Sequence, residues 1–361
     1  MKTYKNLYKK LEDIEFIKNS IKDAARHKTK RKAVAKVLDD LDRYSADLQK
    51  MLLDGSFKPT KVPTMVRWDS CSKKYREINP PVFYPDQCVH WVLINLTKDI
   101  FMRGMYRWNC GNVPGRGTSC GVGYVKKVLE KYPKKTEYCL YMDIHHYYQS
   151  IDHDKLIEML KRKIADKKII DLFEKIIKSN DDGLPLGNYT SQWLANFYLQ
   201  EFDHLMKEKW GADFYCRNVD DMVVIGSNKR KLHKIRKNVQ TYLAGLGLEL
   251  KPNYQVYRVD VRGIDYLGCR FYHDHTSMRK RNYLKLTRNA RKARNEQSAL
   301  GEVKFHTACG LISRNGIIKQ CNHHEIFKNN IGDKLMGECK KSVIKESKKN
   351  SINLYERKGE T

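Results

Sequence analysis

A pair of adjacent aspartates, Asp220-Asp221, is followed at once by the apolar run Met222-Val223-Val224-Ile225. A second apolar run, residues 138–142, ends at another aspartate, Asp143. Short apolar runs next to polar turn residues predict buried β-strands, so the aspartate pair should lie at the tip of a hairpin between two buried strands. Charge in that place lowers local stability, which indicates a functional role.

Carboxylates in such positions are typical of a metal site. Two carboxylates about 4 Å apart repel by roughly 4 kcal/mol at an effective dielectric of 20, so they stay ionised together only when cations lie between them. Hard oxygen ligands select Mg²⁺ or Mn²⁺, and two such ions can hold the attacking and leaving oxygens of a phosphoryl transfer. The alternative is a plain turn between two strands, because aspartate is a common turn residue. Other features of the sequence decide between the two.

The chain carries a large positive charge. Its 70 Lys and Arg residues against 42 Asp and Glu residues give a net charge of +28 over 361 residues. A phosphate-rich polyanion is the simplest partner for this excess, which would otherwise only repel itself in the folded chain. We therefore expect a nucleic acid as partner.

The sequence also limits the cellular compartment. No apolar run reaches the roughly 18 residues of a membrane-spanning helix, and the N-terminus has no signal-peptide pattern. The ten cysteines include no Cys-x-x-Cys pair, which argues against a zinc ribbon and against a secreted disulfide framework. We expect a cytoplasmic protein with no membrane partner.

Apolar spacing predicts a mixture of helices and strands. Spacing of three and four residues indicates amphipathic helices near residues 7–21, 37–51 and 89–101. Prolines between residues 57 and 85 favour short strands near residues 73–78. A strand at 138–144, a helix at about 154–166 with Asp154 as N-cap, a helix through 194–205, the aspartate hairpin, a helix near 232–243 and a further strand follow. This order fits an antiparallel sheet backed by helices, an α+β fold.

Several motifs, in this order, resemble those of bacterial and phage reverse transcriptases. The first catalytic block resembles residues 143–152, and the template-and-nucleotide block resembles residues 184–199. Residues 217–221 resemble the Asp-Asp block, and residues 262–268 resemble the primer-grip region. The resemblance covers roughly residues 70–295. It implies an RNA-directed DNA polymerase with a right-hand fold, made of fingers, a palm with an antiparallel sheet, and a helical thumb.

The resemblance also divides the chain into regions. It implies an N-terminal helical region at 1–60, fingers at 61–135, and a palm with the catalytic motifs at 136–275. The thumb and a basic C-terminal tail would occupy 276–361. Residues 340–349, which are rich in lysine, are expected to become ordered only on RNA.

Site residues follow from the resemblance, position by position. It implies that Asp143, Asp220 and Asp221 are catalytic and hold two Mg²⁺ ions, with Mn²⁺ as a substitute. The implied nucleotide-binding residues are Lys74, Arg76, Tyr148, Gly187 and Gln192. Among these, Tyr148 matches a steric gate that excludes a ribose 2′-hydroxyl. The implied primer- and template-binding residues are Arg116, Arg217, Leu267, Gly268, Lys285, Arg288 and Lys292, and Lys251 is a candidate for protonating the pyrophosphate.

Two positions depart from common patterns of the family. Asn218 stands two residues before the aspartate pair, where the family usually has an aromatic residue, and this puts contact with the primer terminus in question. Ser191-Gln192 stands where group II intron enzymes tend to have Ser-Pro. The Ser-Gln form resembles the enzymes of diversity-generating retroelements and some defence-associated bacterial enzymes.

These features predict a bacterial or phage-encoded enzyme that copies a dedicated noncoding RNA, with dNTPs and a primer-template duplex as its other partners. An accessory protein or a homo-oligomer is an open alternative. The first hypothesis for the biological role is a diversity-generating retroelement, and the second is anti-phage defence. A nonenzymatic RNA-binding scaffold is the alternative of another class. Three clustered carboxylates argue against a scaffold, because they would repel RNA.

Overall fold

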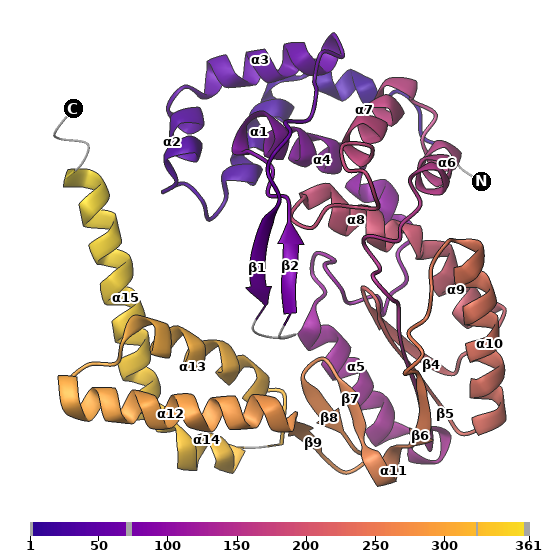
Figure 1. The fold of residues 1–361 in the computed structure, drawn as a ribbon, viewed down its shortest axis with the longest axis vertical. Coiled ribbons are helices and arrows are strands. Elements are labelled where there is room, and N and C mark those ends of the chain that lie inside the picture. The colour runs from indigo at the N-terminus through magenta and orange to yellow at the C-terminus, as the bar shows by residue number, and fades with distance from the viewer. Residues whose placement is uncertain (1–2, 70–73, 323, 357–361) are drawn as a thin grey trace.

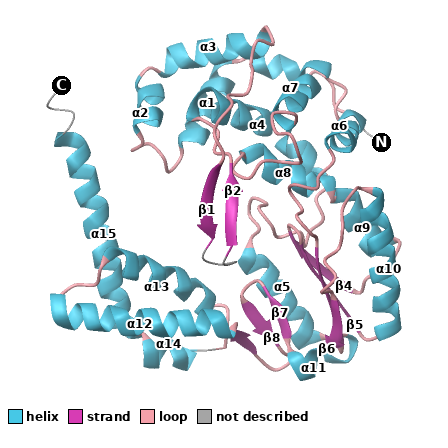
Figure 2. Cartoon of the chain, in the orientation of Figure 1, coloured by secondary structure: helices cyan, strands magenta, loops and turns pink. Residues whose placement is uncertain are grey.

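Three small antiparallel sheets carry the strands of the protein in a computed structural model, which describes residues 3–69, 74–322 and 324–356. Helices make up most of the remaining chain (Figure 2). In Figure 1 the N-terminal helices lie at the top, the largest sheet lies at the lower right, and the C-terminal helices lie at the lower left. Among the described residues, no helix is both long and apolar enough to cross a membrane.

The N-terminal part is a group of helices from which a hairpin projects. Its elements are η1 (Leu7–Glu12), α1 (Ile14–Ala25), α2 (Lys32–Asp39), α3 (Leu41–Leu53), β1 (Met65–Asp69), β2 (Lys74–Ile78), η2 (Phe83–Gln87) and α4 (Cys88–Arg103). The sequence predicts one helix at 7–21, but the Asp13 side chain accepts a hydrogen bond from the Glu15 N–H at 2.9 Å and starts a new helix there. The predicted helix at 37–51 is likewise divided at Asp40, which has a non-helical backbone.

The hairpin β1–β2 has two different faces. Its antiparallel register places Arg67 opposite Arg76 and Trp68 opposite Tyr75, so the arginines and the aromatic rings lie on opposite faces. The rings of Trp68 and Tyr75 meet edge to face at 4.9 Å. In Figure 1 the hairpin descends from the helices at the top toward the lower half of the molecule. The strand predicted near residues 73–78 is confirmed as β2.

The central part is built on a sheet with strand order β4-β5-β3-β6, in which all neighbours are antiparallel. Its elements are α5 (Thr118–Lys131), η3 (Pro133–Lys135), β3 (Tyr138–Asp143), α6 (His153–Lys163), α7 (Lys167–Ile177), α8 (Tyr189–Tyr198), α9 (Gln200–Glu208), β4 (Phe214–Asn218), β5 (Asp221–Gly226), α10 (Lys229–Gly245), β6 (Gln255–Arg258) and α11 (Val259–Arg262). The buried hairpin that the sequence predicts is therefore β4–β5.

Both faces of this sheet are covered, which explains the uninterrupted apolar run in β5. Met222 and Val224 point into a core that includes the inward side of α10. Val223 and Ile225 point the opposite way, into a second core that includes α5 and the sheet that follows. A strand that is buried on both sides has no need for alternation between polar and apolar residues.

Three features of the central part differ from the prediction. Helices α5 and α7 are additional elements, and the predicted helix through 194–205 is divided into α8 and α9. Asp152, not Asp154, caps α6, because its side chain accepts the Lys155 N–H at 3.0 Å. Asp154 is already inside the first turn, where its charge favours the helix N-terminus.

The C-terminal part has its own core. Its elements are β7 (Ile264–Tyr266), β8 (Cys269–Phe271), β9 (Thr276–Met278), α12 (Lys280–Leu300), α13 (Phe305–Ile318), α14 (His324–Asn330) and α15 (Gly332–Glu356). Leu286 of α12, Leu311 of α13 and Met336 of α15 pack in this core. Residues 340–349 continue α15, whose first turns are anchored by buried Leu335 and Cys339, and the dependence of their order on RNA stays a prediction.

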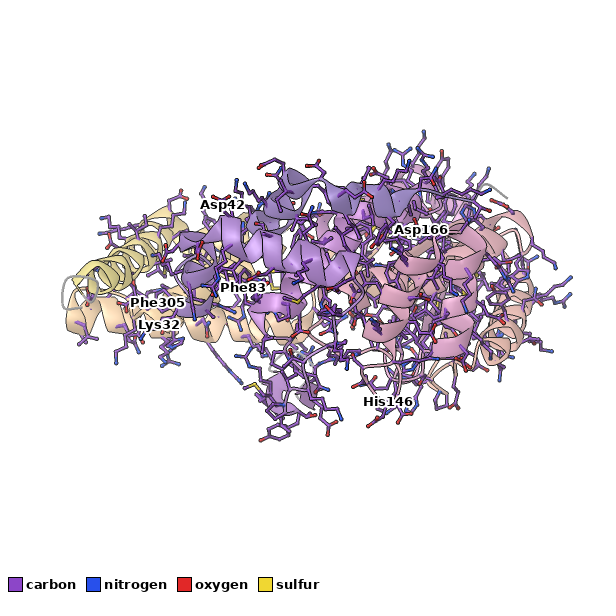
Figure 3. All side chains as sticks on the ribbon, turned by 90° about the horizontal axis from the view of Figure 1, so that it is seen from above. Lys32, Asp42, Phe83, His146, Asp166 and Phe305 are labelled. Carbon is purple, nitrogen blue, oxygen red and sulfur yellow. The ribbon has the colours of Figure 1, made fainter. Side chains whose placement is uncertain are left out.

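The hydrophobic cores do not follow all of the predicted region boundaries. One core extends from Leu11 to Leu250 and joins the N-terminal helices to the central helices, so the described residues 3–60 have no separate core. In Figure 3 Phe83 lies within these packed elements. The core of the C-terminal helices begins at Met278, close to the predicted start of the thumb at residue 276.

Candidate active site

Three carboxylates converge at one end of the central sheet. Asp143 is the last residue of β3 and Asp221 is the first residue of β5, and the register pairs them directly across the two strands. Paired residues in neighbouring strands project from the same face, with Cβ atoms about 5 Å apart. Asp220 occupies the turn just before Asp221 and is half-buried, as they are. Asp143 and Asp221, 78 positions apart in sequence, thus meet, as the sequence predicts.

The turn that carries Asp220 has an unusual backbone. Val219 has a φ of 61°, in the left-handed region that a β-branched residue rarely adopts. Gly111 lies so close to this turn that a Cβ on it would be 2.5 Å from the Val219 nitrogen. Strain of this kind persists only where the surrounding structure fixes it, and it is concentrated at functional sites.

The negative charges of the aspartates repel one another in the absence of a cation. Burial, then the neighbouring Asp221 and Asp143 carboxylates, raise the pKa of Asp220 to about 6. Burial and Asp143 also raise the pKa of Asp221, while a hydrogen bond from the Tyr141 hydroxyl to Asp221 Oδ1 at 2.7 Å opposes that rise. A cation between the carboxylates would relieve this repulsion.

Lys251 is the nearest counter-ion. Its Nζ lies 2.5 Å from Asp143 Oδ2, and its backbone N–H donates to the Asp143 carbonyl at 2.9 Å. The other carboxylate oxygen, Asp143 Oδ1, is buried and has no hydrogen-bond partner among the described residues. An unpaired anionic oxygen beside Asp220 and Asp221 suits a hard divalent cation.

The aspartates alone do not form a closed metal cage. Across residues 3–69, 74–322 and 324–356, no group of three or more His, Cys, Asp or Glu side chains is placed so that it could hold a metal ion. Mg²⁺ typically takes one or two protein carboxylates and completes its shell with water and substrate phosphates. The arrangement fits an ion that binds together with its substrate.

Tyr148 lies beside this site. Burial and the Asp220 charge raise its pKa to about 12, while a hydrogen bond with the Asn112 side chain acts in the opposite direction. The Tyr148 carbonyl accepts the Leu184 N–H at 2.7 Å, which ties this segment to the loop before α8. His146, two residues earlier, points away from the body of the molecule in Figure 3. The half-buried ring of Tyr148 is therefore held next to the carboxylates.

The loop before α8 connects the site to the hairpin β1–β2. Gly187 has a φ of 119°, and a Cβ there would lie 3.2 Å from Ile78 Cγ2. The Asn79 N–H donates to the Leu186 carbonyl at 3.1 Å. Gln192 is exposed on the first turn of α8, because the helix begins at Tyr189.

The two predicted cations of the hairpin lie on β2. Arg76 is exposed and shares a face with Ile78, the residue that contacts the Gly187 loop. The backbone of Lys74 forms the first residue of β2, and its side chain lies outside the described part of the chain. The position of Arg76 supports its predicted role, which stays a prediction.

The sequence prediction for Arg217 is wrong. Its side chain is fully buried, with Nη2 at 2.6 Å and Nε at 2.8 Å from the two oxygens of Asp203, so it has no surface to offer a primer or template. It donates instead to the Val219 carbonyl at 2.9 Å and to Asn196 Oδ1 at 3.3 Å. Arg217 therefore stabilises the strained turn from its buried side, through the Val219 carbonyl.

Two further residues complete this support, and the sequence analysis missed both. Asn196 donates to the Gly111 carbonyl at 2.7 Å and accepts from Asn109 Nδ2 at 2.9 Å. Asp203 also accepts from the Tyr215 hydroxyl at 2.8 Å. A signal was present, because Asn196 and Asp203 interrupt the apolar residues of α8 and α9.

The remaining primer- and template-binding predictions fall on two elements and a loop. Leu267 and Gly268 form the β7–β8 turn with φ values of 50° and 85°, and the Gly268 carbonyl accepts the Arg279 N–H at 3.1 Å at the start of the thumb. Arg288 and Lys292 are exposed on α12, and Lys285 is half-buried there. Arg116 donates to the Tyr106 carbonyl at 2.6 Å, so part of its guanidinium already stabilises its own loop.

Asn218 lies opposite Asp221 in the register of β4 and β5. It therefore occupies the same face as Asp143 and Asp221, where the resembling enzymes usually place an aromatic ring. Its half-buried amide offers hydrogen bonds in place of an apolar surface.

Comparisons with known proteins agree with this geometry. Residues 72–271, more than half of the chain, match the family described as reverse transcriptase (RNA-dependent DNA polymerase). Protein YkfC of Escherichia coli (strain K12) is 23% identical over 257 residues, which span 58% of this chain and 67% of YkfC. The group II intron-encoded protein LtrA of Lactococcus lactis subsp. cremoris is 27% identical over 182 residues, which span 46% of this chain and 30% of LtrA.

Among solved structures, telomerase from Candida tropicalis in complex with a fragment of telomeric RNA is similar with a TM-score of 0.46 and 14% identity, over 82% of this chain and 64% of the telomerase. The family match covers strand β2, the three carboxylates and the β7–β8 turn. The α+β architecture, with its antiparallel palm sheet, is that of a right-hand polymerase. The chain belongs to the reverse transcriptase (RNA-dependent DNA polymerase) family.

Proposed function

We propose that the protein is a reverse transcriptase that copies a dedicated noncoding RNA into DNA within a diversity-generating retroelement. One observation carries the polymerase assignment. Asp143 and Asp221 face each other across β3 and β5, with Asp220 on the strained turn beside them, in a chain that belongs to this family.

Membership of the family implies dependence on a divalent metal, and we propose two Mg²⁺ ions, which Mn²⁺ could replace. Asp143, Asp220 and Asp221 would hold them, since Asp143 Oδ1 lacks a partner in the described structure. Burial, and then repulsion from Asp221 and Asp143, raises the pKa of Asp220, and a bound cation would remove that repulsion. Bound metal would activate the primer 3′-hydroxyl and neutralise the triphosphate. Lys251 holds Asp143 in place and can supply a positive charge, and later a proton, beside the departing pyrophosphate.

The nucleotide site would lie between Tyr148, the Gly187 loop and hairpin β1–β2. The ring of Tyr148 would fill the space that a ribose 2′-hydroxyl needs, so dNTPs are the proposed substrates. Arg76, and Lys74 beside it in sequence, would meet the triphosphate, which calls for cationic partners. Gly187 and Gln192 would contact the nucleotide and the templating base.

The primer-template duplex would extend from the carboxylates past the β7–β8 turn to α12. Leu267 and Gly268 would contact the primer, and Lys285, Arg288 and Lys292 would follow the phosphate backbone of the duplex. The positive charge of the whole chain, +28, supports a nucleic-acid partner. An accessory basic protein would be a further partner in a retroelement, and we propose the bacterial cytoplasm as the site of action.

Primer extension with an RNA template, Mg²⁺ and dNTPs tests the polymerase assignment. Wild-type protein should extend the primer, and a variant with Asp220→Ala and Asp221→Ala should not. Asp260→Asn, at an exposed carboxylate paired with Arg258, is a matched control that should behave as wild type. Equal extension by the double variant and the wild type would leave the nonenzymatic RNA-binding scaffold as the better assignment.

A second candidate role is anti-phage defence. The Ser191-Gln192 form supports it, because defence-associated enzymes share this form with retroelement enzymes. Sequencing of the RNA and DNA that co-purify with the protein separates the two roles. An adenine-mutated copy of a nearby variable gene supports the retroelement. A repetitive cDNA unrelated to any receptor gene supports anti-phage defence.

A further inference from the structure

Two cysteine thiols meet where the C-terminal helices join the rest of the protein. Cys269 is the first residue of β8, and Cys321 lies just after α13. Their Sγ atoms are 3.7 Å apart, although the residues are 52 positions apart in sequence. Cys269 belongs to the core that α5 shares with the β7–β9 sheet, and Cys321 packs against that core and against the core of the C-terminal helices. The pair therefore lies at the junction of two cores, and neither thiol has a role in the proposed function.

Backbone contacts hold the two thiols next to each other. Cys269 pairs with Met278 across β8 and β9. On the same strand β9, the Thr276 N–H donates to Asn322 Oδ1 at 2.9 Å, and the Asn322 N–H donates to the Thr276 carbonyl at 2.8 Å. The residue after Cys321 is thus hydrogen-bonded to the strand that pairs with β8. The contact between the thiols therefore rests on the backbone as well as on side-chain packing.

The two thiols differ in exposure. Cys269 is 0% exposed, whereas Cys321 is half-buried, and the contact between them is only partly buried. Cys321 lines a cavity of about 420 Å³ together with Lys319, whose exposed side chain places this cavity at the surface. An oxidant as small as a peroxide can therefore approach the pair from the side of Cys321. A second thiol pair, Cys110 and Cys216 at 4.0 Å, is buried on both sides.

The electrostatics of the contact favour reaction at Cys321. A hydrogen bond with the Cys269 thiol lowers the pKa of the Cys321 thiol, burial opposes this change, and the charge of Lys126 adds to it. The same hydrogen bond, together with burial, raises the pKa of Cys269. The thiolate is the nucleophilic form of cysteine. Cys321 should therefore be oxidised first, with Cys269 as the resolving thiol that attacks it.

We propose that Cys321 and Cys269 form an oxidative modification site, at which hydrogen peroxide closes a reversible disulfide between the C-terminal helices and β8. First, the Cys321 sulfur attacks one peroxide oxygen, the O–O bond breaks, and a sulfenic acid and a water molecule form. The Cys269 sulfur then attacks the Cys321 sulfur, the S–O bond breaks, and hydroxide leaves with the Cys269 proton as a second water molecule. The two thiols lose two electrons and two protons, and the peroxide gains them.

The disulfide would be of the reversible kind. A dithiol reductant returns both cysteines to thiols by exchange through a mixed disulfide. Disulfides of proteins in reducing compartments, where they occur, are usually transient and redox-sensing. A thiol pair that is reduced at rest and half open to solvent suits that use.

Disulfide mapping of the full-length protein tests this site. Reduced protein is treated with hydrogen peroxide, the remaining thiols are blocked with N-ethylmaleimide, and the peptides of a non-reducing digest are identified by mass spectrometry. Wild-type protein should yield two peptides joined through Cys269 and Cys321, and dithiothreitol should separate them. Cys309→Ser, at a half-buried thiol of α13, is a matched control that should form the same crosslink.

Two variants separate the steps of the reaction. Cys321→Ser should leave Cys269 free to react with N-ethylmaleimide, and Cys269→Ser should hold Cys321 as a sulfenic acid that dimedone labels. Oxidation should raise the thermal unfolding midpoint of wild-type protein and of Cys309→Ser by about 4–16 °C, because a link across 52 positions restricts the unfolded chain. The midpoint of Cys321→Ser should not change on oxidation.

Peroxide-treated wild-type protein in which Cys269 and Cys321 both remain open to N-ethylmaleimide would overturn the proposal, and so would a crosslink from either of them to a different cysteine. This result needs no variant, so it holds even if Cys269→Ser fails to fold. A crosslink that leaves the unfolding midpoint unchanged would also overturn it, because the link would then not join two folded parts. These measurements use no metal, primer or dNTPs, so they are independent of the polymerase assignment.

Discussion

The buried pair of Asp203 and Arg217 makes a strong prediction about stability. Both side chains are 0% exposed, and two hydrogen bonds of 2.6 and 2.8 Å join them. Asp203→Asn keeps the shape and can still accept from the Tyr215 hydroxyl, but it removes the charge and places an amide N–H opposite the donor Arg217 Nη2. An unpaired buried charge costs about 3–5 kcal/mol, a large fraction of the roughly 5–15 kcal/mol that stabilises a typical domain.

Thermal unfolding measures this loss. At about 2–4 °C per kcal/mol, the midpoint of the palm transition should fall by roughly 6–20 °C in Asp203→Asn. The double variant Asp203→Leu with Arg217→Met removes both charges and should be less destabilised than Asp203→Asn, because no unpaired charge remains. A loss below about 1 kcal/mol in Asp203→Asn, the value typical of an exposed pair, would refute the reasoning.

The Asp203–Arg217 pair should also affect catalysis, because Arg217 contacts the turn that carries Asp220. Arg217 also donates to the Val219 carbonyl at 2.9 Å, directly before Asp220. Arg217→Lys keeps the charge but cannot make the paired contact and the turn contact together, because an ammonium lacks the planar fork of a guanidinium. We expect a lower kcat for primer extension with little change in the KM for dNTP. A wild-type rate in a folded Arg217→Lys protein would show that the contact does not position Asp220.

Three further predictions concern the site and the thumb. Burial and the neighbouring carboxylates raise the pKa of Asp220 from 3.8 to about 6, so ionised Asp220 destabilises the metal-free fold above that pH. The thermal unfolding midpoint of wild-type protein should therefore rise relative to that of Asp220→Asn as the pH falls from 7 to 5. Parallel pH profiles of the two proteins would contradict this. Tyr148→Ala should increase incorporation of ribonucleotides relative to deoxynucleotides by about tenfold or more in primer extension, and an unchanged ratio would remove the steric-gate assignment. Lys292→Gln should reduce the slope of log binding constant against log salt concentration for a primer-template duplex by about 0.7–0.9, and an unaltered slope would place Lys292 outside the duplex path.

The parts of the fold that the sequence predicts are those that local patterns determine. The apolar run at 222–225 identifies a doubly buried strand, and the neighbouring aspartates identify its functional end. The buried residues Leu232, Ile235, Val239 and Leu243 recur at three- and four-residue spacing, and α10 follows that pattern. The meeting of Asp143 with Asp221 could also be predicted, because the resemblance supplies the order of strands that periodicity alone leaves open.

Contacts between distant elements were not predictable in the same way. A strongly basic chain makes each arginine near a catalytic motif look like a nucleic-acid contact, and Arg217 fits that pattern by sequence alone. Its partner Asp203 lies 14 residues away on a different element, and only packing brings them together. The continuation of α15 through residues 340–349 is hard to predict for a related reason, since the apolar residues that fix α15 lie just before this segment.

The strained turn explains why such a polar network lies behind the three carboxylates. Val219 is held at a φ of 61° with Gly111 pressed against it, and Asp220 carries a charge that its neighbours oppose. Neither feature stabilises the hairpin, so the energy that maintains this geometry has to come from elsewhere in the fold. Arg217 and Asn196 hold the Val219 and Gly111 carbonyls through hydrogen bonds that are buried and, in Arg217, assisted by the charge of Asp203. Arg217, which the sequence suggests as a primer or template contact, is therefore the residue that holds Asp220 in place beside two carboxylates that repel it.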